Sequence, residues 1–299
     1  MFLVSGPELV IAACKAGIVG AFPTPNARPI EQLEVWMAQI TDGLAALPTD
    51  VIVGPWAANL VTHSSNTRLA QDLALVAKYR PPIVITALGS PKPALEVVHS
   101  YGGRVFGDVV NLKLARKAVE AGVDGLACIA AGAGGHTGFI SAFAFISAVR
   151  EFFHGTIIVG GGIADGYGVA GAIAAGADLV YMGTRFIAAQ ESMAVAGYKD
   201  MLVSSTVDDL IVSDALTGTA ANWLIPSLRA NGLDPANLGS AKERRYDSAD
   251  QSAMKRWALM WSAGQGVGSI KQVESIATIV DSLEREYRAA RDRFAVRSQ

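Results

Sequence analysis

The residues best suited to chemistry lie in one glycine-rich run, residues 131–138, which reads Ala-Gly-Ala-Gly-Gly-His-Thr-Gly and carries His136. Its four glycines let the backbone approach a flat or anionic ligand closely, and an imidazole can bind or transfer a proton near neutral pH. The run follows residues 125–130, an apolar stretch typical of a buried strand. Because α/β proteins carry function on the loops that follow strands, we expect an active-site loop here.

Two later runs have the composition of a phosphate site. Gly160-Gly161-Gly162 follows an apolar stretch, and Tyr181-Met182-Gly183-Thr184 ends the next one. Glycine N–H groups and helix N-termini at successive strand ends suit a phosphate, to which Thr184 can donate its hydroxyl. The spacing does not match a dinucleotide fingerprint, so a mononucleotide is the simpler interpretation. Asp165 is interpreted as a helix cap.

Short apolar runs alternate with amphipathic segments up to about residue 186, which is typical of a parallel sheet covered by helices. The expected strands are 18–22, 51–54, 83–86, 104–108, 125–130, 156–160 and 179–182. The expected helices include 6–16, 30–47, 67–80, 111–121 and 167–176. We predict an α/β fold, a TIM (β/α)8 barrel whose first strand is short or missing. Residues 1–4 are a stub of that strand, or the native chain starts upstream. An open doubly wound sheet is the alternative.

The pattern changes after residue 190. Residues 191–265 show no convincing strand and hold three of the five tryptophans, Trp223, Trp257 and Trp261. We therefore expect a barrel over 1–190 and a small helical subdomain over its mouth at 191–265. Residues 266–299 are expected to form a C-terminal segment whose amphipathic helix, 270–294, packs back on the barrel.

Composition limits the partners. The 299 residues are 51% hydrophobic and 17% charged, with a net charge of −2, so a nucleic-acid-binding chain is not expected. No uninterrupted apolar stretch reaches the 18 residues of a membrane span, despite a mean hydropathy of +0.32. Cys14 and Cys128 lie in apolar surroundings and are expected to be reduced core thiols of a cytoplasmic protein. No spacing of His, Cys and acidic residues predicts a metal site.

Four motifs in order resemble the nitronate monooxygenases, and residues 261–268 fit the same pattern. The motifs are Gly134-Gly135-His136-Thr137-Gly138, Gly161-Gly162-Ile163-Ala164-Asp165-Gly166, Gly176-Ala177-Asp178 and Met182-Gly183-Thr184-Arg185-Phe186. The resemblance implies an FMN-bearing TIM barrel with a smaller helical domain beside the flavin. It also implies oxidation of a small-molecule substrate, an alkyl nitronate, with O2 and without a metal.

Carried over by position, His136 resembles the active-site histidine, as a base or a nitronate-binding group. Gly162, Gly183 and Thr184 resemble the phosphate binders, with Tyr181 and Met182 lining the same turn. Gly134 resembles a backbone contact to the isoalloxazine, and Asn59 resembles a flavin-contacting asparagine on the third strand. The expected FMN-binding set is completed by Gly135 and Gly161.

The chain also departs from the family pattern. Relatives often carry a lysine near the flavin where this chain has Asp108, and a glutamine where it has Ile129. Asp108 is expected either to cap the helix that begins near Asn111 or to act in the site. Two alternatives stay open beside nitronate oxidation: an NAD(P)H-dependent flavin reductase of quinones or enoyl thioesters, and a flavin-binding barrel without turnover. A homodimer is the partner hypothesis, with the oligomeric state left open.

Overall fold

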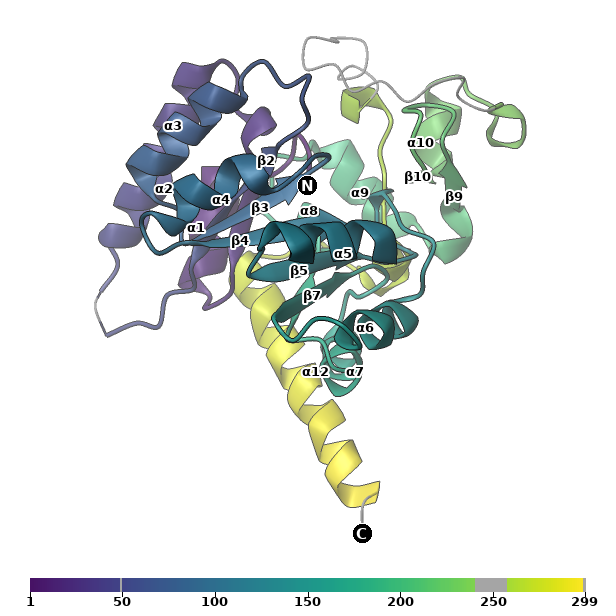
Figure 1. The fold of residues 1–299 in the computed structure, drawn as a ribbon. Helices are drawn as coiled ribbons and strands as arrows, with labels where there is room; N and C mark the ends of the chain where they lie inside the picture. The colour runs from purple at the N-terminus through teal and green to yellow at the C-terminus, as the bar shows by residue number, and fades with distance from the viewer. Residues whose placement is uncertain (49, 240–256, 298–299) are drawn as a thin grey trace.

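The computed structural model describes residues 1–48, 50–239 and 257–297, and its centre is a parallel sheet of seven strands (Figure 1). The strands follow one another along the sheet in chain order. They are β1 (Gly20–Pro23), β2 (Trp56–Val61), β3 (Ile83–Ala87), β4 (Arg104–Val109), β5 (Gly125–Ile129), β7 (Thr156–Gly160) and β8 (Leu179–Tyr181).

The sheet is strongly curled. One apolar cluster contains side chains from all seven strands, reaching from Ala21 on β1 through Phe106 on β4 to Tyr181 on β8. These side chains share one face of the sheet, its inner face. In the part of the chain that the structure describes, however, β1 pairs only with β2 and β8 only with β7. The ladder is thus a curled sheet with two unjoined edges.

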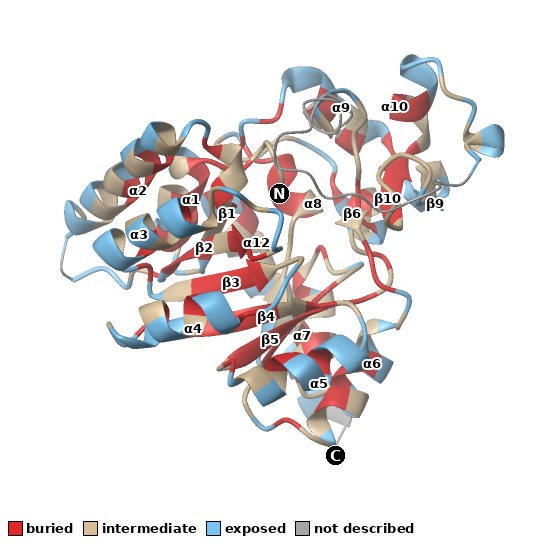
Figure 2. Cartoon of the chain, turned by 45° about the horizontal axis from the view of Figure 1, so that its top comes forward, coloured by how far each residue is buried: buried red, intermediate tan, exposed pale blue. Residues whose placement is uncertain are grey.

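Helices cover the outer face of this sheet. They are α1 (Pro7–Lys15), α2 (Ile30–Ala45), α3 (Leu69–Tyr79), α4 (Lys92–His99), α5 (Leu112–Ala121), α6 (Ala142–Arg150) and α7 (Gly166–Ala174). Figure 2 shows the strands buried and the helices exposed on their outer sides. The main core lies between these two layers and includes Phe22, Leu126 and Phe145. Both faces of the sheet are therefore apolar, as parallel strands require.

The expected strand at 51–54 is wrong. Val51 and Ile52 are exposed, with 43% and 86% of their surface accessible, and the strand lies after Pro55 as β2. The segment was mistaken for a strand because it is β-branched, whereas β2 contains two alanines and an asparagine, which are weak strand formers. Residues 1–4 form a turn rather than a strand stub, and Leu3 adopts a positive φ of 64°.

Two strands occur where none was expected, between residues 191 and 265. Strands β9 (Leu210–Ser213) and β10 (Ala221–Leu224) are antiparallel, and β10 also pairs with β6 (Gly135–His136) in the glycine-rich loop. The neighbouring helices are α8 (Thr184–Ile187), α9 (Ala196–Ser204) and α10 (Ile225–Ala230). Short 3-10 turns are η1 (Thr24–Asn26), η2 (Val207–Asp209), η3 (Pro235–Asn237) and η4 (Gln265–Ser269). The region is mixed rather than helical, and residues 240–256 lie outside the described part.

The last helix, α12 (Ile276–Arg297), runs beside α7 (Figure 1). The N–H of Gly166, the first residue of α7, donates to Glu286 Oε2 at 2.8 Å. A side chain at Gly166 would meet Leu283 O at 2.2 Å, so the glycine permits this close approach. Among the described residues, no helix combines the length and the apolar character that a membrane span needs.

Candidate active site

A cavity of about 2010 Å³ extends from the carboxyl ends of the strands into the curled sheet. Its mouth is lined by the glycine-rich runs, including Gly134, Gly162 and Gly183. Its interior is lined by apolar strand residues such as Ile85 and Phe106. The volume exceeds the roughly 300–1,000 Å³ of a typical small-molecule site, so the cavity can hold a cofactor together with a substrate.

The three glycine-rich runs meet a fourth segment, residues 264–266. Gly132 O accepts from the N–H groups of Gly162 and Gln265, at 3.1 and 2.9 Å. Thr184 Oγ1 accepts from Gly264 N at 2.8 Å, which leaves the hydroxyl proton of Thr184 free for another acceptor. The expected convergence of these runs is thus present, and residues 264–266 hold it together.

Glycine is required at Gly134 for steric reasons. A Cβ there would lie 2.6 Å from Gly264 N and 3.0 Å from Thr184 Oγ1. Gly161 and Gly162 have φ values of +136° and +71°, which favour glycine. A Cβ on Gly162 would meet only Gln265 Cβ, at 3.9 Å, so the backbone there borders open space. The segments around Gly134, Gly161, Gly162, Thr184 and Gly264 thus form a surface made largely of backbone, which we call the cradle.

The N-termini of α7 and α8 lie near this cradle and differ in the N–H groups that are available to bind an anion. Asp165 Oδ1 caps α7 by accepting from Gly168 N at 2.7 Å, which confirms its interpretation as a cap. Together with Glu286 on Gly166 N, it occupies that helix terminus. In the first turn of α8, the N–H groups of Thr184 and Arg185 have no partner within the helix. The donors available for a phosphate are therefore at Gly183–Thr184 rather than at α7.

His136 lies on β6, opposite Ala221 of β10, and lines the cavity. Its ring stands edge-on to Trp257, with ring centroids 5.4 Å apart. Trp257 in turn packs against Trp223, which is fully buried. The imidazole thus packs against an aromatic wall supplied by residues far along the chain.

Asn59 and Tyr181 both line the cavity from inside the sheet. Asn59 lies on β2, two residues after the inward-facing Ala57, and side chains alternate along a strand. Tyr181 packs with the inner apolar cluster, and burial raises the pKa of its hydroxyl. Met182 packs against Phe186 and the α1 side instead, while still bordering the cavity.

Asp108 is not a helix cap. It lies within β4, and the cap of α5 is Asn111, whose Oδ1 accepts from Leu114 N at 2.9 Å. Its side chain follows Phe106 onto the inner face and lines the cavity. Burial raises the pKa of this carboxyl to about 7. Ile129 also lines the cavity, as an apolar residue on β5.

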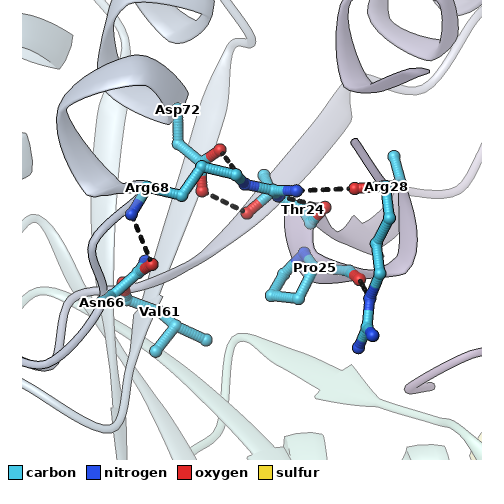
Figure 3. Close-up of polar contacts among 8 residues, drawn as sticks. Thr24, Pro25, Arg28, Val61, Asn66, Arg68 and Asp72 are labelled. Carbon is cyan, nitrogen blue, oxygen red and sulfur yellow. Dashed lines mark hydrogen bonds and ion pairs between the residues drawn. The ribbon is translucent and has the colours of Figure 1, made fainter. Parts of the chain in front are cut away.

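An ion pair braces the cavity wall near β1 and β2 (Figure 3). Arg68 Nε contacts Asp72 Oδ1 at 2.8 Å, and its other nitrogens donate to Ala27 O and Thr24 O at 2.7 Å each. The second carboxylate oxygen of Asp72 accepts from Thr24 Oγ1 at 3.1 Å. Arg68 thereby ties the loop after β1 to the start of α3.

A family model described as nitronate monooxygenase matches residues 1–286, almost the whole chain. The chain belongs to the nitronate monooxygenase family. A nitronate monooxygenase from Paraburkholderia phytofirmans is 29% identical over 232 residues, which cover 72% of this chain and 63% of that protein. The chain thus spans less than two thirds of that family member.

Two solved structures share the fold of the chain described here. A nitroalkane oxidase from Streptomyces ansochromogenes superposes with a TM-score of 0.80 at 21% identity, covering 97% of this chain and 94% of its own. The enoyl reductase domain of MlnA from Bacillus amyloliquefaciens gives 0.74 at 15% identity, covering 97% and 93%. At these identities the likeness concerns the fold alone.

Sequence reasoning missed two residues beside the site. Trp257 was counted only as a tryptophan, although it backs the His136 ring. Asn222 on β10 has both side-chain amide atoms buried without a partner among the described residues. No local signal predicts either position, because a contact between residues about 90 to 120 positions apart depends on the fold. The run Leu210–Ser213, by contrast, is β-branched and could have been recognised as a strand.

Proposed function

We propose that this chain is an FMN-dependent enzyme that oxidises alkyl nitronates with O2. The observation that carries the proposal is the backbone cradle, in which a side chain at Gly134 would collide with Gly264 N at 2.6 Å. Such a bare cradle at strand ends, beside the free first-turn donors of α8, suits the phosphate of a mononucleotide. FMN would supply the electron acceptor that O2 regenerates.

The residues of the chain have separate roles in this proposal. Gly183 and Thr184 bind the phosphate, with Gly134, Gly135, Gly161 and Gly162 forming the surface against which the cofactor lies. Asn59 contacts the flavin from the inner face of the sheet, with Tyr181 and Met182 beside it. His136 binds the anionic nitronate or removes the proton next to the nitro group. Its fixed position against Trp257 supports this role, since a positioned base lowers the entropy cost of the step.

The proposal includes the architecture. The curled sheet is a TIM barrel that lacks its first strand within these residues, and residues 191–265 form a unit over its mouth. Residues 266–299 pack back on the barrel through α12. We further propose that the protein is cytoplasmic and that it forms a homodimer. Sedimentation analysis of the purified protein would test the homodimer.

An anaerobic titration tests the function directly. The purified protein should be yellow, and propane-2-nitronate should bleach the bound flavin without O2, while NADPH should not. The variant His136→Asn should retain FMN but need at least about tenfold more propane-2-nitronate for half-maximal bleaching, because a hydrogen bond to a charged group contributes about 1.5–3 kcal/mol. A flavin that no nitronate bleaches would rule out the substrate class while leaving FMN binding intact.

The second candidate is an NAD(P)H-dependent reductase of quinones or enoyl thioesters. It is favoured by the size of the cavity and by the fold shared with the enoyl reductase domain of MlnA. Rapid bleaching by NADPH, with no response to nitronates, would support it. A yellow protein that responds to neither would indicate a flavin-binding barrel without turnover.

A further inference from the structure

The side chain of Asp108 lines the cavity from the inner face of the sheet. It is the last inward-facing residue of β4, two positions beyond Phe106 on the same face. Its register partner on β5 is Ala127, which offers no polar group. The carboxyl therefore projects from an apolar wall into the cavity.

One oxygen of the Asp108 carboxyl lacks a hydrogen-bond partner among the described residues. This oxygen, Oδ1, is buried. A buried polar atom without a partner destabilises the fold, and it does so more strongly when it is charged. Because this oxygen is shielded from water and from the cavity, a charge on it is disfavoured, while the accessible remainder of the half-buried side chain is what a ligand in the cavity meets.

Few charged groups face Asp108 from the surrounding elements. Those that interact with it electrostatically are the hydroxyl of Tyr181 on β8, the thiol of Cys128 on β5 and the amino group of Met1. The same cavity is also lined by His136 and by further titratable or charged residues, among them Arg28, Arg68, Asp72, Lys92, Lys117 and Glu120. The amino group lowers the pKa of Asp108, but burial outweighs it and raises that pKa to about 7. The neutral form is thus favoured below pH 7, and the charged form appears as the pH rises above it.

We propose that Asp108 determines ligand specificity: its protonated carboxyl donates a hydrogen bond to an anionic ligand in the cavity, and its ionised form repels that ligand. The inference rests on the proposed function, because a nitronate is the anion concerned. A protonated carboxyl has one donor, which pairs with a nitro or carboxylate oxygen. The ionised carboxylate only accepts, so the same oxygen then meets a like charge.

The test uses isobutyrate, an unreactive anion with nearly the shape of propane-2-nitronate, and calorimetric titration from pH 5.5 to 9. The Kd of the unmodified protein should rise by up to about tenfold between pH 6 and 8, the limit that applies when the ionised form does not bind. In Asp108→Asn, which keeps a donor but cannot ionise, the Kd should stay near the low-pH value at every pH. In Asp108→Leu it should be weak throughout. Glu34→Gln, an exposed carboxyl on α2 remote from the cavity, serves as the control and should behave as the unmodified protein.

A rise in Kd that persists unchanged in Asp108→Asn would assign the pH dependence to another titratable group of the cavity, such as His136, and overturn the inference. So would equal binding by the Asn and Leu variants, since the donor would then be irrelevant.

An infrared titration of the purified protein provides a readout that needs neither ligand nor turnover. The band of a protonated carboxyl should disappear as the pH rises through about 7, and Asp108→Asn should lack it. Its absence from the unmodified protein at pH 6 would also overturn the inference. If the protein holds no FMN, the proposed function fails, yet these two measurements still decide the role of Asp108.

Discussion

At the scale of single residues, the site depends on glycine positions that leave no room for a side chain. Gly134 has no room for a methyl group, because Gly264 N and Thr184 Oγ1 already occupy that space. The contact also orients Thr184, whose Oγ1 accepts from Gly264 N and keeps its proton for another acceptor. The cradle is therefore sensitive to substitutions that would be harmless on a surface loop.

Substitution Gly134→Ala should weaken FMN binding at least about tenfold, or by ~1.4 kcal/mol. The added Cβ must displace residues 263–264 or Thr184, which moves the donors of the cradle. Fluorescence quenching of FMN measures the Kd. Gly268→Ala is the matched control on the neighbouring segment, because a Cβ there meets nothing within 4 Å. Equal affinities for both variants would contradict the cradle.

Substitution Arg68→Ala should destabilise the fold by about 3 kcal/mol, because it leaves the buried Asp72 without its cation. We take the low end of the range for a broken buried pair, since 21% of the Arg68 side chain is exposed. Urea unfolding measures the loss. Lys78→Ala breaks the exposed pair with Glu34 and should leave stability nearly unchanged.

The loss in Arg68→Ala should shrink in acid. Burial raises the pKa of Asp72, and Arg68 opposes that shift. Without Arg68 the folded-state pKa rises further, so the folded variant binds a proton more tightly than the unfolded chain does. Its stability relative to the unmodified protein then recovers as the pH falls below that raised pKa. A loss that is constant from pH 7 to pH 4 would show that Asp72 is not the group responsible.

At the scale of elements, two contacts between distant segments build the site. Strand β10 pairs with β6 and so fixes the backbone of the His136 loop. Helix α12 packs against α7, the helix that follows the second glycine-rich run, through the bond from Gly166 N to Glu286. Both contacts use segments from the last third of the chain to hold the loops of the sheet.

Substitution Gly166→Ala should separate α12 from α7 and destabilise the protein by about 1–3 kcal/mol, as overpacking does. The new Cβ would lie 2.2 Å from Leu283 O, a backbone atom that cannot turn aside. Gly171→Ala in the same helix meets only Phe143, at 3.8 Å, and should be neutral or stabilising by up to ~1 kcal/mol. Thermal unfolding of the two variants compares them, and equal melting temperatures would contradict the proposed close contact.

At the scale of the whole molecule, the cavity joins segments from all parts of the chain. Residues from β1 to β8 line it, and Trp257 and residues 262–266 close it on one side. A ligand that binds only the folded arrangement stabilises it by mass action, by about 2.7 kcal/mol at a hundredfold excess over Kd. Ligand binding should therefore stabilise all the segments of the cradle at the same time.

Added FMN should therefore slow amide hydrogen exchange in residues 132–135, 160–163, 183–185 and 264–266 at the same time. Exchange measured by mass spectrometry with and without FMN checks this. The exposed turn at 231–239 serves as the internal reference and should be unaffected. Protection at 183–185 without protection at 264–266 would contradict a shared cradle.

The sequence alone predicts what local spacing determines. Repeated apolar runs and helix stops predicted six of the seven strands, because burial between helices imposes a recognisable pattern on each. The glycine-rich runs were placed correctly at strand ends, since the carboxyl ends of parallel strands meet at one edge. The prediction failed at β2, where close packing inside the curled sheet favours alanines that carry no strand signal.

Only the tertiary structure decided the surroundings of the chemical groups. The backing of His136 by Trp257, the fixing of Thr184 by Gly264 and the pairing of β6 with β10 all join residues about 80 or more positions apart. Asp108 shows the same division. Its type and position were evident in the sequence, but its place on the inner face of β4 depends on strand phase, and its missing partner depends on every neighbour. A carboxyl becomes less acidic when it loses its water, and that loss is a property of the folded molecule.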